Sequence, residues 1–233
     1  MKFDRYTIGA RLFPAMLASV PFFVLSHYYL TPKIGDFVAI LNSYAWVGDV
    51  TITVAGIFLL MQASRWISKP FFEDRIFEKG KNFPTTYFLM FSNGYYSTEH
   101  TEVIHKKILS DFQINLFTHR EEAEDEAGAR QRIKEAISLV RNYVGDNGLV
   151  LQHNIEYGFA RNLVGAAVIA SVVSLANVVL FYFIEQNSVA FTISLVTFAI
   201  YIIYVLLGTK IMRYLGENYA DVFLNEYLKQ RTK

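Results

Sequence analysis

Hydrophobic residues along this chain form two long blocks, separated by a polar block of ordinary composition. The first apolar block, residues 12–64, contains three charged residues, and the second, residues 162–209, contains one. A helix needs about 20 mostly apolar residues to cross the hydrocarbon core of a bilayer. Each block is long enough for two crossings, so the pattern predicts an integral membrane protein.

A polar break divides each block into a pair of helices. The first pair is expected at 8–30 and at about 44–64, and the second pair at 162–184 and 189–209. The connection at 185–188 is short, which favours antiparallel neighbours. The expected fold class is therefore mainly α, with four transmembrane helices arranged as two hairpins.

The polar block between the hairpins is long enough to fold into a small domain, which its amphipathic patterns predict to be mostly helical. The chain after the fourth span continues as an amphipathic helix that we expect to pack on this domain. The sequence therefore divides into a first transmembrane hairpin at 1–65, a cytoplasmic domain at 66–161, a second hairpin at 162–209 and a C-terminal helix at 210–233.

Local signals place helices inside the cytoplasmic domain. Ser97, followed by threonine and glutamate, predicts the start of a helix that ends near Phe112. Thr118 is expected to cap a longer helix that reaches about Val144, with apolar residues at 4-3-4 spacing. The segment 82–91, rich in aromatic residues and threonine, is the one candidate for an extended strand.

The positions of lysine and arginine predict the orientation of the chain in the membrane. Basic residues near the span ends gather on one side, whereas Lys33 is the only one expected on the other. Cytoplasmic segments carry the excess of basic residues in membrane proteins. We therefore expect a multi-pass protein with both termini and the middle domain in the cytoplasm.

The third span carries small and polar residues along one helical seam. Ala167, Ala170, Ser174 and Asn177 recur at spacings of three and four residues. Small residues at such spacing favour close helix packing in membranes, and the same seam could line the pore of an oligomer. Asp49, near the outer end of the second span, is a further pore-lining candidate because a ring of carboxylates attracts cations.

The cytoplasmic domain contains residues that could bind a nucleotide or a single strand of nucleic acid. Tyr95 and Tyr96 could stack on bases, and Arg130, Arg132 and Lys134 could hold phosphates. The alternative is that the tyrosines belong to the core and the basic residues form salt bridges along their helix. The near-balanced charge of the chain argues against binding to double-stranded DNA.

Signals for catalysis or for a resident metal are missing from the sequence. The chain contains no cysteine, and His100 and His105, five residues apart, do not share a helical face. Both histidines, and the acidic run at 121–126, are expected at the solvent-exposed surface. We therefore expect no enzyme activity, no metal site and no cofactor.

Three segments of the sequence are similar to a known family. They are Phe83–Asn93, His105–Ile114 and Glu156–Leu163, and together they resemble the membrane effectors of Hailong-type phage-defence systems in bacteria. These effectors are small membrane proteins that act beside a nucleotidyltransferase. The resemblance is carried by short motifs within about 83–163.

The resemblance implies a homo-oligomeric ion channel, tetrameric in form, in the bacterial inner membrane. A partner nucleotidyltransferase would make a short single-stranded DNA that binds the cytoplasmic domain and keeps the channel shut, and loss of that ligand would depolarise the membrane. The motif around Tyr157, Gly158 and Arg161, where the third span enters the bilayer, would couple the domain to the pore. The alternative function is a membrane-anchored sensor or scaffold without a pore.

Overall fold

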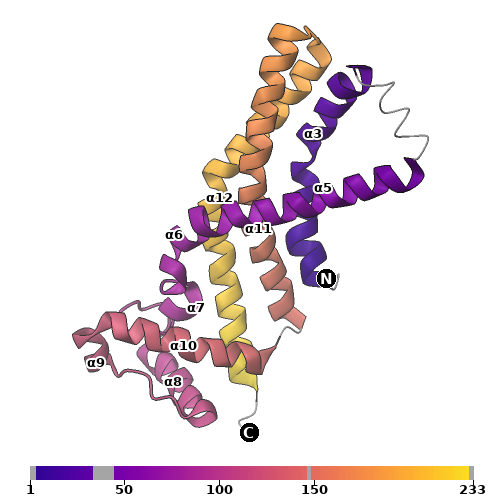
Figure 1. The fold of residues 1–233 in the computed structure, drawn as a ribbon. Helices are drawn as coiled ribbons and strands as arrows, with labels where there is room; N and C mark the ends of the chain where they lie inside the picture. The colour runs from indigo at the N-terminus through magenta and orange to yellow at the C-terminus, as the bar shows by residue number, and fades with distance from the viewer. Residues whose placement is uncertain (1–3, 34–44, 146–147, 231–233) are drawn as a thin grey trace. The chain divides into compact units, whose positions relative to one another are not determined.

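All regular structure in the described part of the chain is helical (Figure 1). The computed structural model describes residues 4–33, 45–145 and 148–230, with the backbone alone for 45–52. The elements are α1 (Arg5–Thr7), η1 (Ile8–Leu12), α2 (Phe13–Ala18), α3 (Val20–Leu25), η2 (Ser26–Leu30), α5 (Ala45–Ser68), η3 (Lys69–Glu73), α6 (Asp74–Ile76), η4 (Glu78–Gly80), α7 (Pro84–Tyr87), α8 (Thr98–Phe112), α9 (His119–Glu124), α10 (Glu126–Val144), α11 (Gly148–Val179), η5 (Leu180–Ile184) and α12 (Ser188–Lys229). The predicted mainly-α class is confirmed.

The chain divides into two compact units. Unit 1 comprises Met1–Phe72 and Gly158–Ile211, and unit 2 comprises Glu73–Tyr157 and Met212–Lys233. Helix α11 contributes its first part to unit 2 and the rest to unit 1, and α12 contributes in the opposite order. Two of the three passages between the units therefore lie inside unbroken helices, and the first lies in η3.

Three helices of the described chain are long and apolar enough to cross a membrane: Arg5–Lys33, Gly148–Ile184 and Ser188–Lys229. The sequence predicted four spans, and the structure does not confirm the remaining one. Helix α5 is continuous over 24 residues, but the side chains of 45–52 lie outside the described residues. The long apolar helices are those of a membrane protein.

Glycines let the helices of unit 1 approach one another closely. A Cβ added at Gly165 on α11 would lie 2.0 Å from the carbonyl oxygen of Ser64 and 2.9 Å from the backbone nitrogen of Ser68, both in α5. A Cβ added at Gly208 on α12 would lie 2.3 Å from a methyl group of Val164. Packing of backbone against backbone is typical of helices in membranes, where small residues are selected at the contact.

The first helical stretch of unit 1 is interrupted several times. Pro14 lies in α2 and Pro21 lies in α3, and the π-helical turns η1 and η2 flank these two short helices. A proline inside a helix removes the hydrogen bond that its N–H would donate to the carbonyl four residues earlier. Each proline therefore leaves a backbone carbonyl that needs another donor.

Unit 2 packs around a core of large apolar side chains. The core joins the α7 region, helices α8 and α10, and the last part of α12. Its largest members are Phe88, Leu89, Met90, Ile104, Ile108, Ile133, Ile137, Val140, Tyr219, Phe223, Leu224 and Tyr227. The prediction that the C-terminal amphipathic segment packs on the middle domain is confirmed.

Helix starts in unit 2 follow the capping residues that the sequence displays. The Ser97 side chain accepts a hydrogen bond from the backbone N–H of His100 at the start of α8. Thr118 forms a capping box at the start of α9. The predicted long helix from Thr118 is nevertheless two helices, because Asp125 leaves the helical conformation and caps α10 through the N–H of Gly128.

The prediction of an extended strand at 82–91 is wrong. Residues Pro84–Tyr87 form the helical turn α7, and only Phe83, the residue before it, is extended. Proline favours the first turn of a helix because its missing N–H would have no partner there. The threonines and aromatic residues that suggested a strand are partly or fully buried in the core of unit 2.

Candidate functional site

The small-residue seam of α11 is buried inside a single chain. Ala167, Ala170 and Ser174 are fully buried, and Asn177 is 1% exposed. The two alanines pack in a cluster with Ala18. The Ser174 hydroxyl donates to Thr197 Oγ1 at 3.3 Å, and the Asn177 amide donates to the carbonyl of Pro21 at 2.8 Å. The burial agrees with the packing interpretation of this seam, and the pore-lining role stays a prediction.

Asp49, the remaining pore-lining candidate, lies in the part of α5 for which only the backbone is described. The structure therefore gives no contact for its carboxylate. The prediction for Asp49 falls outside the described side chains.

Polar side chains of α11 and α12 donate hydrogen bonds to the carbonyls that the prolines leave without an α-helical donor. The Asn162 amide donates to the carbonyl of Ala10, four residues before Pro14, at 2.6 Å. The Tyr201 hydroxyl donates to the carbonyl of Leu17, four residues before Pro21, also at 2.6 Å. A buried carbonyl without a donor costs about 1–3 kcal/mol, so these bonds stabilise the interrupted helix.

Neither Asn162 nor Tyr201 was predicted from the sequence as a functional residue. A signal was present, because each proline identifies the carbonyl four residues before it as one that needs a donor. The side chain that supplies this donor, and the helix that carries it, cannot be predicted from the sequence. The structure answers this by bringing α11 and α12 against the first helical stretch.

Two of the three coupling candidates lie beside Tyr6 in unit 1. A Cβ added at Gly158 would lie 2.8 Å from the Tyr6 hydroxyl and 2.9 Å from Ala10 Cβ, so glycine allows this close approach. The Arg161 guanidinium donates to the Tyr6 hydroxyl at 3.4 Å. The Arg11 guanidinium lies over the Tyr6 ring, 5.4 Å from its centroid. Tyr6 therefore joins the start of the first helical stretch to α11.

The third coupling candidate, Tyr157, belongs to unit 2. Its hydroxyl donates to the carboxylate of Glu73 at 2.7 Å. Its ring packs edge-on against Phe83, with ring centroids 5.4 Å apart, and beside Phe77. Tyr157 is 4% exposed, so it fixes the first part of α11 within the aromatic packing of this unit.

Two of the ligand-binding candidates, Arg130 and Lys134, lie against the loop Lys79–Asn82. Arg130 donates to the side-chain oxygen of Asn82 and to Glu126. The Lys134 ammonium donates to the carbonyl of Lys79 at 3.1 Å. We call Lys79–Asn82 together with Arg130 and Lys134 the basic loop site.

The backbone that leads into this loop is in a rarely used conformation. Glu78, Lys79 and Gly80 have φ values of 46°, 55° and 87°. A left-handed conformation is unfavourable for residues other than glycine, and such strain is often found at functional sites. The conformation presents the side chains of Lys79 and Lys81, both exposed, on the same short segment as the carbonyl that Lys134 contacts.

The other ligand-binding candidates do not join the basic loop site in any contact that the described residues show. Arg132 is exposed and lies two residues from both Arg130 and Lys134, which places it on a different side of α10. Its charge lowers the pKa of Glu121, after the larger effect of the hydrogen bonds from Thr118. The five candidates are therefore not one site.

Both tyrosine candidates lie near carboxylates, Tyr96 in a hydrogen bond and Tyr95 at longer range. Tyr95 stacks on Phe88, with ring centroids 3.5 Å apart, and the Tyr96 hydroxyl donates to Asp221 at 2.8 Å. Burial raises the pKa of Tyr96, and the hydrogen bond to Asp221 raises it further. Among the described residues, the charged neighbour of both rings is the carboxylate of Asp221, which would repel a phosphate.

Two residues expected at the solvent-exposed surface are largely buried. Glu122 is 3% exposed, and its carboxylate accepts hydrogen bonds from the N–H groups of Phe91 at 3.0 Å and Ser92 at 2.8 Å. His105 donates through Nε2 to the carbonyl of Leu89 at 2.9 Å, and burial lowers its pKa. These two side chains form hydrogen bonds with backbone groups of the turn after α7. The sequence around Glu122 and His105 does not show that this turn needs such partners.

Within the described residues, no group of three or more histidine, aspartate or glutamate side chains is arranged to hold a metal ion. Comparison of the chain with protein-family models, with curated proteins and with solved structures finds no match.

Proposed function

We propose that the chain is one subunit of a homo-oligomeric ion channel of the bacterial inner membrane, gated by a ligand on unit 2. In this proposal α5 supplies the fourth span, the four spans form two hairpins, and both termini lie in the cytoplasm. The protein would act as a phage-defence effector of the Hailong type, and its opening would depolarise the membrane. A tetramer is the assembly that the resemblance implies.

The observation that carries the proposal is the continuity of α11 and α12. Each is a single helix that contributes to the cores of both units. A change in the packing of unit 2 would reach the apolar helices without crossing a flexible linker. Gating by a ligand needs a packed element that has two arrangements and connects the ligand site to the pore.

The basic loop site is the place on unit 2 where we propose that the ligand binds. Lys79, Lys81 and Lys134 supply positive charge around a strained backbone segment, and Arg130, which also pairs with Glu126, adds a fourth cation. The ligand class is a nucleotide or a short single-stranded DNA made by a partner nucleotidyltransferase. Phosphates bind such groups through charge-assisted hydrogen bonds, and ordering of the loop would be the response.

A second candidate function, a membrane-anchored sensor or scaffold without a pore, is favoured by a specific observation. The seam of α11 that could line a pore is buried against helices of the same chain. A channel would therefore need other residues at its axis, or a rearrangement of these helices. The scaffold needs neither.

Ion flux from vesicles that contain the purified full-length chain separates the two functions. The channel predicts flux in vesicles without ligand, and less flux when short single-stranded DNA is present on the unit 2 side. Double-stranded DNA of equal charge is the ligand control. Oligomers that pass no ions with or without DNA would contradict the channel and leave the scaffold.

A pair of double variants tests the ligand site. Arg130→Glu with Lys134→Glu should remove the response of the flux to DNA, because it reverses two charges at the basic loop site. Arg120→Glu with Arg132→Glu changes the same net charge at exposed positions on α9 and α10 and should leave the response intact. Equal responses in the two variants would place the ligand elsewhere.

A further inference from the structure

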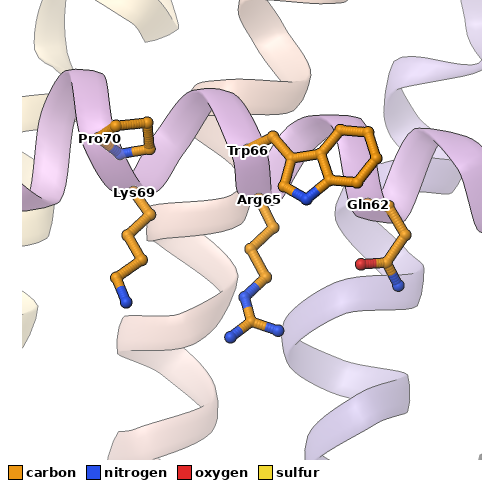
Figure 2. Close-up of a pocket in the computed structure, with 5 residues that line it drawn as sticks. All are labelled: Gln62, Arg65, Trp66, Lys69 and Pro70. Carbon is orange, nitrogen blue, oxygen red and sulfur yellow. The ribbon is translucent and has the colours of Figure 1, made fainter.

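The end of α5 carries a pocket that neither the seam of α11 nor the basic loop site uses. Gln62, Arg65 and Trp66 of α5, with Lys69 and Pro70 of η3, line an open pocket with a volume of about 320 Å³. Figure 2 shows the side chains of Gln62, Arg65 and Lys69 projecting from the same side of the helix, with the Trp66 ring beside them. The pocket lies entirely within unit 1.

The chemistry of the pocket is that of an anion site. Arg65 and Lys69 are exposed, and within the described residues neither side chain forms an ion pair or a hydrogen bond. The Trp66 indole, 70% exposed, offers one further N–H donor. Guanidinium, ammonium and indole groups only donate hydrogen bonds. The ligand that satisfies them carries several acceptor oxygens and negative charge, as a phosphate group does.

The surface that leads to the pocket is apolar. Val54, Phe58, Gln62, Arg65 and Lys69 follow one another at spacings of four, four, three and four residues, which places them on one helical stripe. Val54 is 58% exposed and Phe58 is 45% exposed. The stripe therefore begins with exposed apolar side chains and ends with two cations.

This order matches the order of groups in a phospholipid. Acyl chains lie in the hydrocarbon core, and phosphates lie at the interface, where tryptophan and basic side chains are enriched. An anion from solution would gain nothing from the apolar half of the stripe. A lipid gains from both halves.

We propose that this pocket binds the phosphate of an anionic phospholipid, whose acyl chain lies along Val54 and Phe58. The proposal rests on the membrane placement of unit 1 in the proposed function, and it does not require a pore. Basic residues near a membrane surface each contribute about 1 kcal/mol to the attraction of anionic lipid. Two such residues give an expected preference of about tenfold or more over a neutral lipid.

Trp66 itself can report the bound lipid. The chain contains two tryptophans, so Trp46→Phe leaves Trp66 as the single fluorescent indole. The full-length variant is placed in vesicles of mixed phosphatidylglycerol and phosphatidylcholine. Bromine, which quenches tryptophan at contact, is carried on the acyl chains of one lipid or the other at the same mole fraction. Stronger quenching by brominated phosphatidylglycerol is the expected result.

Two double variants in the same background distinguish the pocket from the general surface charge. Arg65→Gln with Lys69→Gln should make quenching by the two brominated lipids equal. Lys210→Gln with Arg213→Gln removes two exposed cations from α12 and should keep the preference for phosphatidylglycerol. Equal quenching in the unaltered pocket, or equal loss in both variants, would overturn the proposal.

A competition experiment distinguishes a lipid phosphate from free phosphate as the ligand of the pocket. Inorganic phosphate replaces chloride at constant ionic strength, and the preference for brominated phosphatidylglycerol should remain. If phosphate abolishes it, the pocket takes a soluble anion and the lipid proposal is wrong. The flux assay is independent: a chain that shows the lipid preference but conducts no ions would contradict the pore alone, and a conducting chain without the preference would contradict the lipid site alone.

Discussion

Different buried polar contacts stand out in the two units. In unit 1, side chains such as Asn162, Asn177 and Tyr201 each donate to a backbone carbonyl of the interrupted first helix. In unit 2, the buried carboxylate of Glu122 accepts from two backbone N–H groups of a turn. Asn162 and Tyr201 thus supply donors to the carbonyls that Pro14 and Pro21 leave without one, whereas Glu122 supplies an acceptor to a turn.

The two units also differ in the size of the apolar side chains that they bury. Unit 1 buries alanines between its helices and exposes large side chains such as Val172 and Leu206, at 64% and 71%. Unit 2 buries large aromatic and aliphatic residues such as Phe88 and Tyr227. Burial of small residues with large ones outside is the arrangement of helices in lipid, where the surroundings are as apolar as the interior. Unit 1 thus has the packing expected of helices in lipid, whereas unit 2 has a core of large apolar side chains.

The largest effect is expected at the turn of unit 2. Glu122→Ala removes the acceptor for two N–H groups, and hydrogen bonds to a charged group are worth about 1.5–3 kcal/mol each. We expect the free energy of unfolding of unit 2 to fall by about 3 kcal/mol, measured by denaturation and amide exchange of the full-length chain in detergent. Glu124→Ala, at a 67% exposed side chain that pairs with Arg120, should cost less than about 0.5 kcal/mol. Similar losses of stability in the two variants would show that the hydrogen bonds of Glu122 do not stabilise the turn.

The close approach of α11 and α5 is the corresponding weak point of unit 1. Gly165→Ala forces a methyl group against backbone atoms of Ser64 and Ser68, which cannot move aside as a side chain can. We expect a loss of about 2 kcal/mol, in the usual range for overpacking, seen as a lower melting temperature in detergent. Gly56→Ala meets nothing within 4 Å and should be neutral or slightly stabilising. A neutral Gly165→Ala would mean that the helices do not pack this closely.

A rescue experiment tests the link between proline and donor. Tyr201→Phe should cost about 1 kcal/mol, because the carbonyl of Leu17 loses its side-chain donor. Adding Pro21→Ala should recover most of that loss, since residue 21 then has an N–H that can donate to the same carbonyl. The control is Tyr204→Phe, because the Tyr204 hydroxyl forms no hydrogen bond within the described residues. Absence of rescue would show that Tyr201 acts through packing alone.

The smallest effect is a dependence on pH that should be confined to unit 2. Burial holds the pKa of His105 below its ordinary value of 6.5, so below that pH the unfolded chain takes up a proton that the folded chain does not. Stability is therefore unaffected above about pH 6.5 and falls as the pH drops, by less than about 1 kcal/mol at pH 6. Denaturation between pH 5.5 and 8 measures this, and His105→Gln should flatten the profile. A slope that persists in His105→Gln would assign the effect to another group.

Elements with strong local signals could be predicted from the sequence. Ser97 and Thr118 predict the starts of the helices that they cap, because a capping side chain acts within three residues of its own position. The C-terminal segment was predicted to pack on the middle domain from its apolar spacing alone. The break at Asp125 and the helical turn at Pro84 were missed, since at both places short-range hydrogen bonding overrides the pattern of side-chain types.

The candidate sites depend on contacts between distant segments, which a single sequence does not contain. Arg130 and Lys134 share a helical face and meet the same loop, so their grouping follows from spacing. Tyr95 and Tyr96 were grouped with them by residue type, but the acidic partner Asp221 comes from a helix more than 100 residues away in the sequence. The pocket at Arg65 was missed because its basic residues were interpreted only as markers of orientation.

The turn η1, which ends two residues before Pro14, changes which way the side chains of this stretch face. A π-helical turn holds one residue more than the α-helical register allows, and each residue turns a helix by about 100°. The side chains before η1 therefore face a direction turned by about one such step from the one that an unbroken α-helix would give them.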